Sequence, residues 1–289
     1  MKIVFFGTPE FSVPFLDTLA SDPEMQMLAV VTQPDKPVGR KQELVASEVK
    51  LRAQELAIPV LQFVSLKRPE VLETLKALEA DMFVVINYGK LIPKSLLELP
   101  RFGCVNVHPS LLPKYRGPSP IRAPIENGDT ETGISIMLLD EGMDTGPILA
   151  QKTVPVLADE TTPQLTDRLA QIGAPFFLET LKLYAAGAIQ PVAQDDSKAT
   201  LTTMLDRESG KIDWSDAPEA IERKIRAYTP WPGTYTITQH HGKPLRVKIL
   251  TARLEQGQLQ ILEVQPEGSR PMSYDAFVRG YGPLDTSQS

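Results

Sequence analysis

The chain is poor in the residues on which disulfide and metal chemistry depend. Its 289 residues include one cysteine and three histidines. A lone Cys104 cannot form an internal disulfide, and this agrees with a reducing compartment. So few cysteines and histidines do not make up the ligand set of a zinc site. We therefore expect no disulfide and no catalytic metal.

Long hydrophobic runs are missing as well. No apolar stretch approaches the roughly 20 residues that a helix needs to cross a bilayer. The first residues, Met1 to Gly7, are predicted to form a strand that reaches a turn too early for a signal peptide. The composition, 42% hydrophobic and 23% charged, is that of an ordinary globular protein. We expect a cytoplasmic protein without a membrane partner.

Glycine is scarce where a dinucleotide site would need it. The first predicted strand ends at Gly7-Thr8-Pro9-Glu10, where Thr8 is expected to cap a helix that starts at Pro9. A single glycine stands here in place of the Gly-x-Gly-x-x-Gly fingerprint. This disfavours an NAD-dependent oxidoreductase.

Strands and helices are predicted to alternate through most of the chain before residue 190. Asp81 to Ile86 is a nearly continuous apolar run, which is typical of a strand covered on both faces of a parallel sheet. The pattern predicts an α/β fold with a doubly wound, mostly parallel, Rossmann-like sheet. Such sheets bind their ligands beyond the carboxyl ends of the strands.

The chain length suits one large and one small domain. We predict a catalytic domain over residues 1–189 and a linker over 190–205, where apolar periodicity is weak. Short alternating segments predict a small β domain over 206–280. The last nine residues, 281–289, have no pattern and are expected to be disordered.

The net charge of −6 is unevenly distributed. Arg246 and Lys248 share one face of a predicted strand, with Val247 and Ile249 on the other face. A local basic patch on an acidic protein is typical of binding to a polyanion. Between residues 223 and 253 the chain has no acidic residue and seven basic ones: Arg223, Lys224, Arg226, Lys243, Arg246, Lys248 and Arg253.

The most informative stretch runs from Cys104 to Ile121. Alternation over its first five residues puts Asn106 and His108 on the same face at the end of a strand, which Pro109 terminates. The loop that follows is stiffened by proline, so it can hold a ligand with little loss of entropy. A single histidine at a strand end is more often structural, so the wider pattern decides.

Two motifs resemble the signature of the folate-dependent formyltransferases. They are Asn106-Val-His108-Pro-Ser-Leu-Leu-Pro113-Lys-Tyr-Arg-Gly117 and Asp140-Glu-Gly-Met-Asp144-Thr-Gly146. The resemblance implies the formyltransferase fold, 10-formyltetrahydrofolate as co-substrate, and catalytic roles for Asn106, His108 and Asp144. It also implies a folate site that is lined by Asn87, Tyr88, Gly89, Ile92, Ser110, Leu111, Leu112, Pro113, Asp140 and Gly142.

Formyl transfer needs donors for an oxyanion and a route for one proton. Asn106 can donate to the oxyanion. His108 can donate to the same oxygen or accept the proton of the amine, because its ordinary pKa lies near neutrality. Asp144 is expected to fix the tautomer of the imidazole. The reaction needs no covalent enzyme intermediate, so the lack of an activated serine or cysteine is consistent with it.

Three further passages resemble the branch of the family that formylates the α-amino group of methionyl initiator tRNA. They are Phe6-Gly-Thr-Pro-Glu-Phe11 with Thr32 to Arg40, Ile212-Asp-Trp-Ser215, and Ile225 to Gly233. The resemblance implies this tRNA as partner, and we expect a monomer. The candidate tRNA-binding residues are Arg40, Lys41, Lys243, Arg246 and Lys248.

The chain departs from the family in two places. Glu43 stands where relatives tend to be basic, and the C-terminal domain lacks extra strands after Arg253, which predicts a shortened, OB-like barrel. Two alternatives stay open. One is a sugar-nucleotide N-formyltransferase or a glycinamide ribonucleotide formyltransferase. The other is a non-catalytic tRNA-binding protein on a formyltransferase scaffold, against which the intact Asn106, His108 and Asp144 count.

Overall fold

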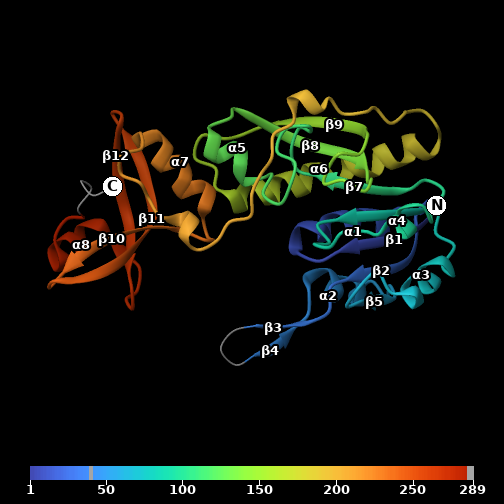
Figure 1. Cartoon of the computed structure of the whole chain (residues 1–289), viewed down its shortest axis with the longest axis horizontal. Coiled ribbons are helices and arrows are strands. Elements are labelled where there is room, and N and C mark those ends of the chain that lie inside the picture. Colours follow the sequence, from blue (N-terminus) through green and yellow to red (C-terminus); the bar gives the residue numbers. More distant parts are fainter. Residues whose placement is uncertain (39–41, 285–289) are drawn as a thin grey trace. The chain divides into compact units, whose positions relative to one another are not determined.

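The alternating first part of the chain builds one seven-stranded sheet in the computed structural model, which describes residues 1–38 and 42–284 (Figure 1). The strand order is β5-β2-β1-β6-β7-β8-β9, and β5, β2, β1, β6 and β7 are parallel. β8 is antiparallel to β7. The predicted Rossmann-like, mostly parallel sheet is confirmed. The strands are β1 (Lys2–Gly7), β2 (Gln26–Thr32), β5 (Val60–Gln62), β6 (Met82–Ile86), β7 (Cys104–His108), β8 (Glu131–Leu138) and β9 (Ile148–Pro155).

The strand order reverses direction between β1 and β6. From β1 the chain builds outward through β2 to β5, then returns to the other side of β1 with β6 and β7. Ligands of such sheets bind in the crevice at this reversal, beyond the carboxyl ends of the strands. The residues at that edge include Gly7, Ile86 and His108.

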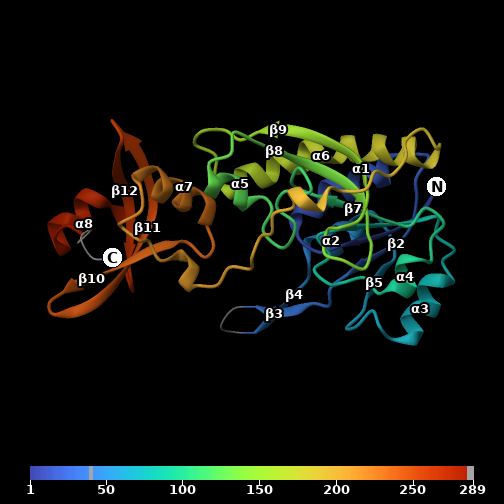
Figure 2. The ribbon, with the colours of Figure 1, turned by 45° about the horizontal axis from the view of Figure 1, so that its top comes forward.

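Helices cover both faces of the sheet. Phe6 and Phe83 belong to one apolar cluster with residues of α3 (Pro69–Lys76) and α4 (Lys94–Leu97). On the opposite face, Gly173 of α6 lies against Phe15 of α1 and Ile134 of β8, and Phe15 also packs on Phe177. Figure 2 shows α6 beside β8 and β9. The remaining elements here are α1 (Val13–Ser21), α2 (Glu48–Glu55) and α6 (Thr162–Ala185).

The first helix begins later than the sequence predicts. Thr8 does not cap it. Its hydroxyl donates instead to the backbone carbonyl of Tyr88 at 3.1 Å, and a 3-10 turn, Glu10–Ser12, precedes α1. A short hairpin, β3 (Lys36–Val38) and β4 (Glu43–Val45), follows β2. The chain thus uses Thr8 to join two loops at the carboxyl edge of the sheet.

The density of internal contacts divides the chain into two units. Unit 1 contains 1–117, 133–154 and 167–201, and unit 2 contains 118–132, 155–166 and 202–289. On the last stretch the division falls after Leu201, inside the range predicted as a linker. Two earlier inserts also belong to unit 2, because α5 (Arg122–Asn127) packs against α7 (Pro218–Tyr228). The sequence contains no clear signal for α5.

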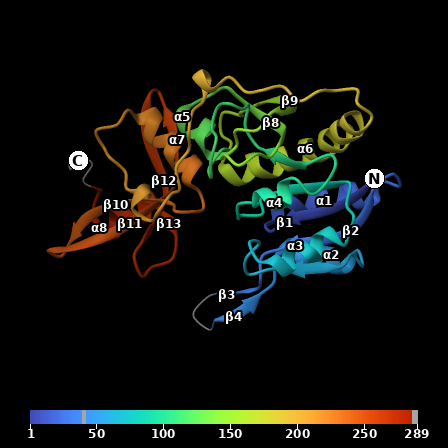
Figure 3. The ribbon, with the colours of Figure 1, turned by 45° about the vertical axis from the view of Figure 1, so that its right-hand side comes forward.

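Unit 2 has an antiparallel sheet in the order β10-β11-β12-β13 (Figure 3). Its core includes Ile225 of α7, Val247 and Ile249 of β11, and Phe277 of α8. Val247 and Ile249 are buried and Lys248 is exposed, so the predicted alternation is confirmed. The elements are β10 (Thr234–His240), β11 (Lys243–Glu255), β12 (Gln258–Pro266), β13 (Met272–Ser273) and α8 (Tyr274–Tyr281).

The prediction of disorder from residue 281 is wrong for residues 281–284. Tyr281 is the last residue of α8 and stacks on Phe277 with ring centroids 5.0 Å apart. Leu284 is buried in the core of unit 2. The apolar cluster around Leu284 includes residues of α7, β11 and β12, which lie far away in the chain, so the local sequence did not reveal it. Residues 285–289 lie outside the described residues.

Over the described part of the chain, no helix combines the length and apolarity needed to cross a bilayer.

Candidate active site

Both ring nitrogens of His108 face a partner at the carboxyl end of β7. Nε2 lies 2.9 Å from the backbone carbonyl oxygen of Tyr115, and Nδ1 lies 3.6 Å from Oδ1 of Asp144. The His108 side chain is 6% exposed and that of Asp144 is 17% exposed. Tyr115 and Asp144 have left-handed backbones, with φ angles of 62° and 57°. This conformation is uncommon outside glycine, and here two such residues meet one imidazole.

The two contacts determine which nitrogen of a neutral imidazole carries the proton. A carbonyl oxygen cannot donate, so the contact with Tyr115 requires the proton on Nε2. Nδ1 then holds the lone pair. Its 3.6 Å distance to Asp144 is too long for a hydrogen bond, yet close enough for a strong charge interaction once Nδ1 is protonated. The Tyr115 carbonyl, and not Asp144, therefore sets the tautomer.

Burial of His108 lowers the pKa of its imidazole below the ordinary value of 6.5. The negative charge of Asp144 and the carbonyl of Tyr115 oppose this shift in pKa, but more weakly. His108 is thus neutral at pH 7, with a basic nitrogen that faces a carboxylate. This arrangement can accept a proton and then stabilise the resulting charge.

Asn106 lies two residues before His108 and on the same face of β7. It pairs in register with Val85 of β6 and Met137 of β8, and it is 9% exposed. Within residues 1–38 and 42–284, its side-chain amide makes no hydrogen bond. An amide donor without a protein partner therefore lies beside the histidine.

The loop that carries Asp144 is held by its own side chains. Oδ1 of Asp140 accepts hydrogen bonds from the backbone N–H of Gly142 and from the hydroxyl of Thr145. Gly146 leaves no room for a Cβ, which would lie 1.9 Å from the carbonyl oxygen of Leu138. Oδ2 of Asp144 accepts from the backbone N–H of Gly117 at 2.8 Å. The second carboxylate oxygen thus fixes the direction of the first.

The Ser110–Pro113 segment is bound from β8. Ser135 donates to the carbonyl of Ser110 and accepts from the backbone N–H of Leu112. The Ser110 hydroxyl donates to the carbonyl of Lys114, and both Ser110 and Leu112 are buried. Leu111 packs against the backbone of Gly133. The side chains of Ser110 and Leu112 are therefore used inside the protein, which leaves only the remaining surface of the segment available to a ligand.

The loop after β6 mixes exposed backbone with a buried side chain. Asn87 and Gly89 are exposed, with φ angles of 48° and 79°. The Tyr88 ring is 1% exposed and packs on Phe6, and burial raises the pKa of its hydroxyl to about 12. The Tyr88 carbonyl accepts hydrogen bonds from the side chains of Thr8 and Gln33, and its ring belongs to the core. Tyr88 thus contributes no exposed side chain to the folate site that the resemblance implies, and that site stays a prediction.

The loops after β6 and β8 converge on one apolar cluster. Ile92 and Leu139 both pack on the cluster that contains Tyr88 and Cys104. Beyond them, Asp140 and Gly142 are exposed. The structure therefore brings two of the three segments predicted to bind folate, the loops after β6 and β8, onto one apolar cluster.

The candidate tRNA-binding residues differ in their surroundings. Lys243 and Lys248 are exposed on β11. The guanidinium of Arg246 stacks on the ring of Tyr235 at 3.4 Å and lies 3.8 Å from a carboxylate oxygen of Glu208. Arg40 and Lys41 lie outside the described residues.

Three other cations of the basic stretch lie on α7 and bind partners inside unit 2. Arg226 forms a buried ion pair with Glu222 and also donates to the carbonyl of Glu160. Arg223 donates to the carbonyl of Glu126, and Lys224 to that of Lys211. The basic stretch therefore divides into cations that hold unit 2 together and cations on its sheet.

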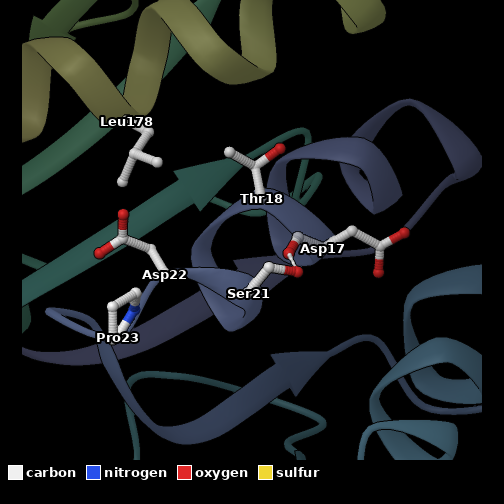
Figure 4. A pocket seen from close by; sticks show the side chains of 6 residues that line it. All are labelled: Asp17, Thr18, Ser21, Asp22, Pro23 and Leu178. Atoms are coloured by element: carbon white, nitrogen blue, oxygen red, sulfur yellow. Dashed lines mark hydrogen bonds between the residues drawn. The ribbon is translucent and has the colours of Figure 1, made fainter.

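A separate concavity of about 420 Å³ lies between α1 and α6 (Figure 4). It is lined by Asp17, Thr18, Ser21, Asp22, Pro23 and Leu178. Asp22 forms an ion pair with Lys182, and Asp17 forms one with Arg52. The residues before β2 lie at the amino edge of the sheet, opposite His108. No group of three metal-ligating side chains occurs among the residues that the structure describes.

Comparisons with known proteins identify the family of the chain. The Formyl transferase family matches residues 1–181, and the Formyl transferase, C-terminal domain matches residues 204–258. A methionyl-tRNA formyltransferase of Roseiflexus sp. is 44% identical over 97% of this chain and 92% of its own length. Another, of Chloroflexus aurantiacus, is 42% identical over 97% of both.

A solved structure has the same fold across both units. The methionyl-tRNA formyltransferase of Clostridium thermocellum superposes with a TM-score of 0.63 at 19% identity, over 92% of this chain and 98% of that one. The motifs around Asn106, His108 and Asp144, the strand order and the two matched regions agree with one another. The chain therefore belongs to the formyltransferase family, and within it to the methionyl-tRNA formyltransferases.

Proposed function

We propose that this chain transfers a formyl group from 10-formyltetrahydrofolate to the α-amino group of methionyl initiator tRNA. The observation that carries the proposal is the position of Asp144 3.6 Å from Nδ1 of a neutral, buried His108. The partnerless amide of Asn106 lies beside them. Family membership supports the donor and the acceptor, and the geometry supports the roles of the residues.

His108 accepts the proton of the attacking amine on Nδ1. The proton on Nε2 stays bonded to the Tyr115 carbonyl, so the lone pair of Nδ1, on the side of Asp144, is left to take up a proton. The imidazolium that forms lies between two acceptors, the carbonyl of Tyr115 and the carboxylate of Asp144. Both stabilise its charge until the proton passes to the leaving nitrogen of the folate.

Asn106 donates its amide N–H to the formyl oxygen as negative charge develops there. A donor held by a buried strand is positioned before the reaction and needs little rearrangement during it. No side chain of this set has to form a covalent bond, which fits a direct transfer between two nitrogens.

The folate fits the loops around this set. A pterin ring has donors and acceptors along its edge and an apolar face. The exposed backbone of Asn87, Gly89, Asp140 and Gly142 can meet the edge, and the cluster under Ile92 can meet the face. When bound, 10-formyltetrahydrofolate supplies the formyl group at the oxidation level of the product, so no redox step is required.

The tRNA acceptor fits the exposed cations of β11. Lys243 and Lys248 project into solvent, where they can neutralise phosphates without leaving an ion pair. The Arg246 guanidinium, stacked on Tyr235, is held in place for a similar contact. An acceptor of this kind places the reaction in the cytoplasm, where tRNA is charged.

The test is an assay of the purified chain with 10-formyltetrahydrofolate and methionyl initiator tRNA, followed by separation of formylated from free methionyl-tRNA. We expect formylation that depends on the folate. A deoxythymidine-diphosphate amino sugar, offered in the same assay, serves as the alternative acceptor. Transfer to the sugar and none to the tRNA would overturn the proposed acceptor. Binding of tRNA without transfer to either acceptor would support the non-catalytic alternative.

A further inference from the structure

The Asp144 backbone is held by a side chain from a distant segment. The Nε2 amide group of Gln194 donates to the carbonyl of Asp144 and to the carbonyl of Gly146, both at 2.8 Å. One amide group, that of Gln194, thus binds the carbonyls of both Asp144 and Gly146. This contact stabilises the left-handed backbone of Asp144, which is uncommon for a residue with a side chain.

The other end of the same amide binds the loop that carries Tyr115. Oε1 of Gln194 accepts from Nε and Nη2 of Arg116, at 3.1 and 2.8 Å. Arg116 is 6% exposed, and Nη2 also donates to Asp196. Arg116 follows Tyr115 directly in the chain. The loops that supply both partners of His108 therefore meet at one side chain.

Gln194 is itself fixed on both sides along the chain. Two residues earlier, Val192 exchanges two backbone hydrogen bonds of 2.8 Å with Ile148. Six residues later, the Thr200 backbone bonds to Pro113 and Arg116, and its hydroxyl accepts from the N–H of Tyr115. Residues 192–200 are therefore hydrogen-bonded at both ends, to Ile148 and to the loop that carries Tyr115. These bonds fix the position of the Gln194 amide between them.

We propose that Gln194 is a positioning residue, which holds the carboxylate of Asp144 and the carbonyl of Tyr115 at the two nitrogens of His108. It touches no reacting atom. Its amide joins two loops that share no backbone hydrogen bond with each other in the described part of the chain. The role rests on the proposed function, because it concerns the proton that His108 takes up.

Gln194→Glu is the sharpest test. The new carboxylate keeps the acceptor for Arg116 but replaces the two N–H donors with an oxygen that faces two carbonyls. We expect the Asp144 loop to move away from His108. The kcat for formylation should fall about tenfold, and KM for folate and for tRNA should stay within about twofold.

Gln164→Glu is the matched control. Oε1 of Gln164 accepts from the backbone N–H and the hydroxyl of Thr161, and a carboxylate can keep both bonds. The change in charge is the same. We expect kcat to stay at the wild-type value, so that an effect of Gln194→Glu cannot be assigned to added negative charge alone.

A double-mutant cycle with Asp144→Asn separates positioning from a structural role. If Gln194 acts through the carboxylate, Gln194→Glu should change kcat less than twofold once that carboxylate is gone. A tenfold loss in both backgrounds would overturn the proposal, and so would an unchanged kcat in Gln194→Glu alone. Should Gln194→Glu fail to fold, Gln194→Asn, which withdraws the amide by one methylene, should give a smaller loss with the same coupling.

An NMR titration of the His108 imidazole makes the test independent of activity. The negative charge of Asp144 favours the imidazolium form of His108. If the Asp144 carboxylate moves away in Gln194→Glu, the pKa of His108 should therefore fall further. An unchanged titration would overturn the positioning role. If the wild-type chain formylates no tRNA, the proposed function fails, but this titration still decides whether Gln194 holds Asp144 at His108.

Discussion

The polar groups at the rim of the seven-stranded sheet and the cations of the β10–β11 sheet are arranged in opposite ways. Around His108 the imidazole is buried against the Tyr115 carbonyl and Asp144, and Asp144 is held by the backbone N–H of Gly117. On β11, Lys243 and Lys248 are exposed. A proton transfer fails if a group moves by about an ångström. Attraction to a phosphate backbone acts over a Debye length of about 8 Å and tolerates such movement. The chain thus buries the groups around His108 and leaves Lys243 and Lys248 on an open surface.

The largest effect is expected at the rim, from His108→Gln. Loss of a general base typically lowers the rate about 10²- to 10⁴-fold, and we expect kcat/KM to fall within this range. Circular dichroism should show an unchanged fold. His241→Gln is the matched control, because His241 is exposed on the hairpin between β10 and β11. An equal loss in both variants would contradict the special role of His108.

Asn106→Ala should have the next largest effect. It removes one donor to the developing oxyanion, and such losses are typically about 10²-fold or more in kcat. Because the amide makes no hydrogen bond in the described part of the chain, stability should change little. A thermal melt measured beside kcat checks this. A large fall in Tm with an unchanged kcat would show that Asn106 is structural.

The pH dependence gives a third test of the rim. Burial lowers the pKa of His108, so kcat/KM should be level near pH 7 and fall as the pH drops through a value below 6.5. The native state binds a proton less readily than the unfolded chain, so stability should also fall as the pH drops below 6.5. In Asp144→Asn the fall in kcat/KM should lie at lower pH. A shift to higher pH would mean that Asp144 does not stabilise the imidazolium.

The smallest effect is expected on the open surface. Lys248→Gln removes one exposed charge, so tRNA binding should weaken a few-fold and the slope of log affinity against log salt should drop by about one. The value of kcat at saturating tRNA should not change. Lys67→Gln, on unit 1 outside the basic stretch, is a matched control that should leave the slope unchanged. A fall in kcat for Lys248→Gln would contradict the idea that the residues around His108 determine the rate and the exposed cations of β11 only the binding of tRNA.

Much of the fold follows from local patterns. The apolar run of β6 and the alternation in β7 both predict their elements, and the same alternation puts Asn106 and His108 on one face. The predicted approach of Asp144 to His108 agrees with the 3.6 Å distance. The elements follow from residues close together in the chain, whereas the approach of Asp144 to His108 followed from the family resemblance.

The features that the sequence did not reveal depend on backbone direction and distant contacts. The Tyr115 carbonyl reaches His108 through a left-handed backbone at a residue with a side chain, and no propensity identifies that carbonyl. Gln194 meets Asp144 across 50 residues. Tyr88 lies in a polar loop, yet its ring is in the core. A residue type alone does not tell which part of the residue faces a ligand.

The central claim is that neutral His108 carries its proton on Nε2 and presents Nδ1, beside Asp144, as the base. Nitrogen-15 NMR of the imidazoles tests it directly, since the chain has three histidines and His108→Gln identifies the signal. We predict a pKa below 6.5 and, above that pKa, the Nε2-protonated tautomer, with Nδ1 gaining its proton on acidification. A neutral form protonated on Nδ1, or a pKa above 6.5, would contradict the account.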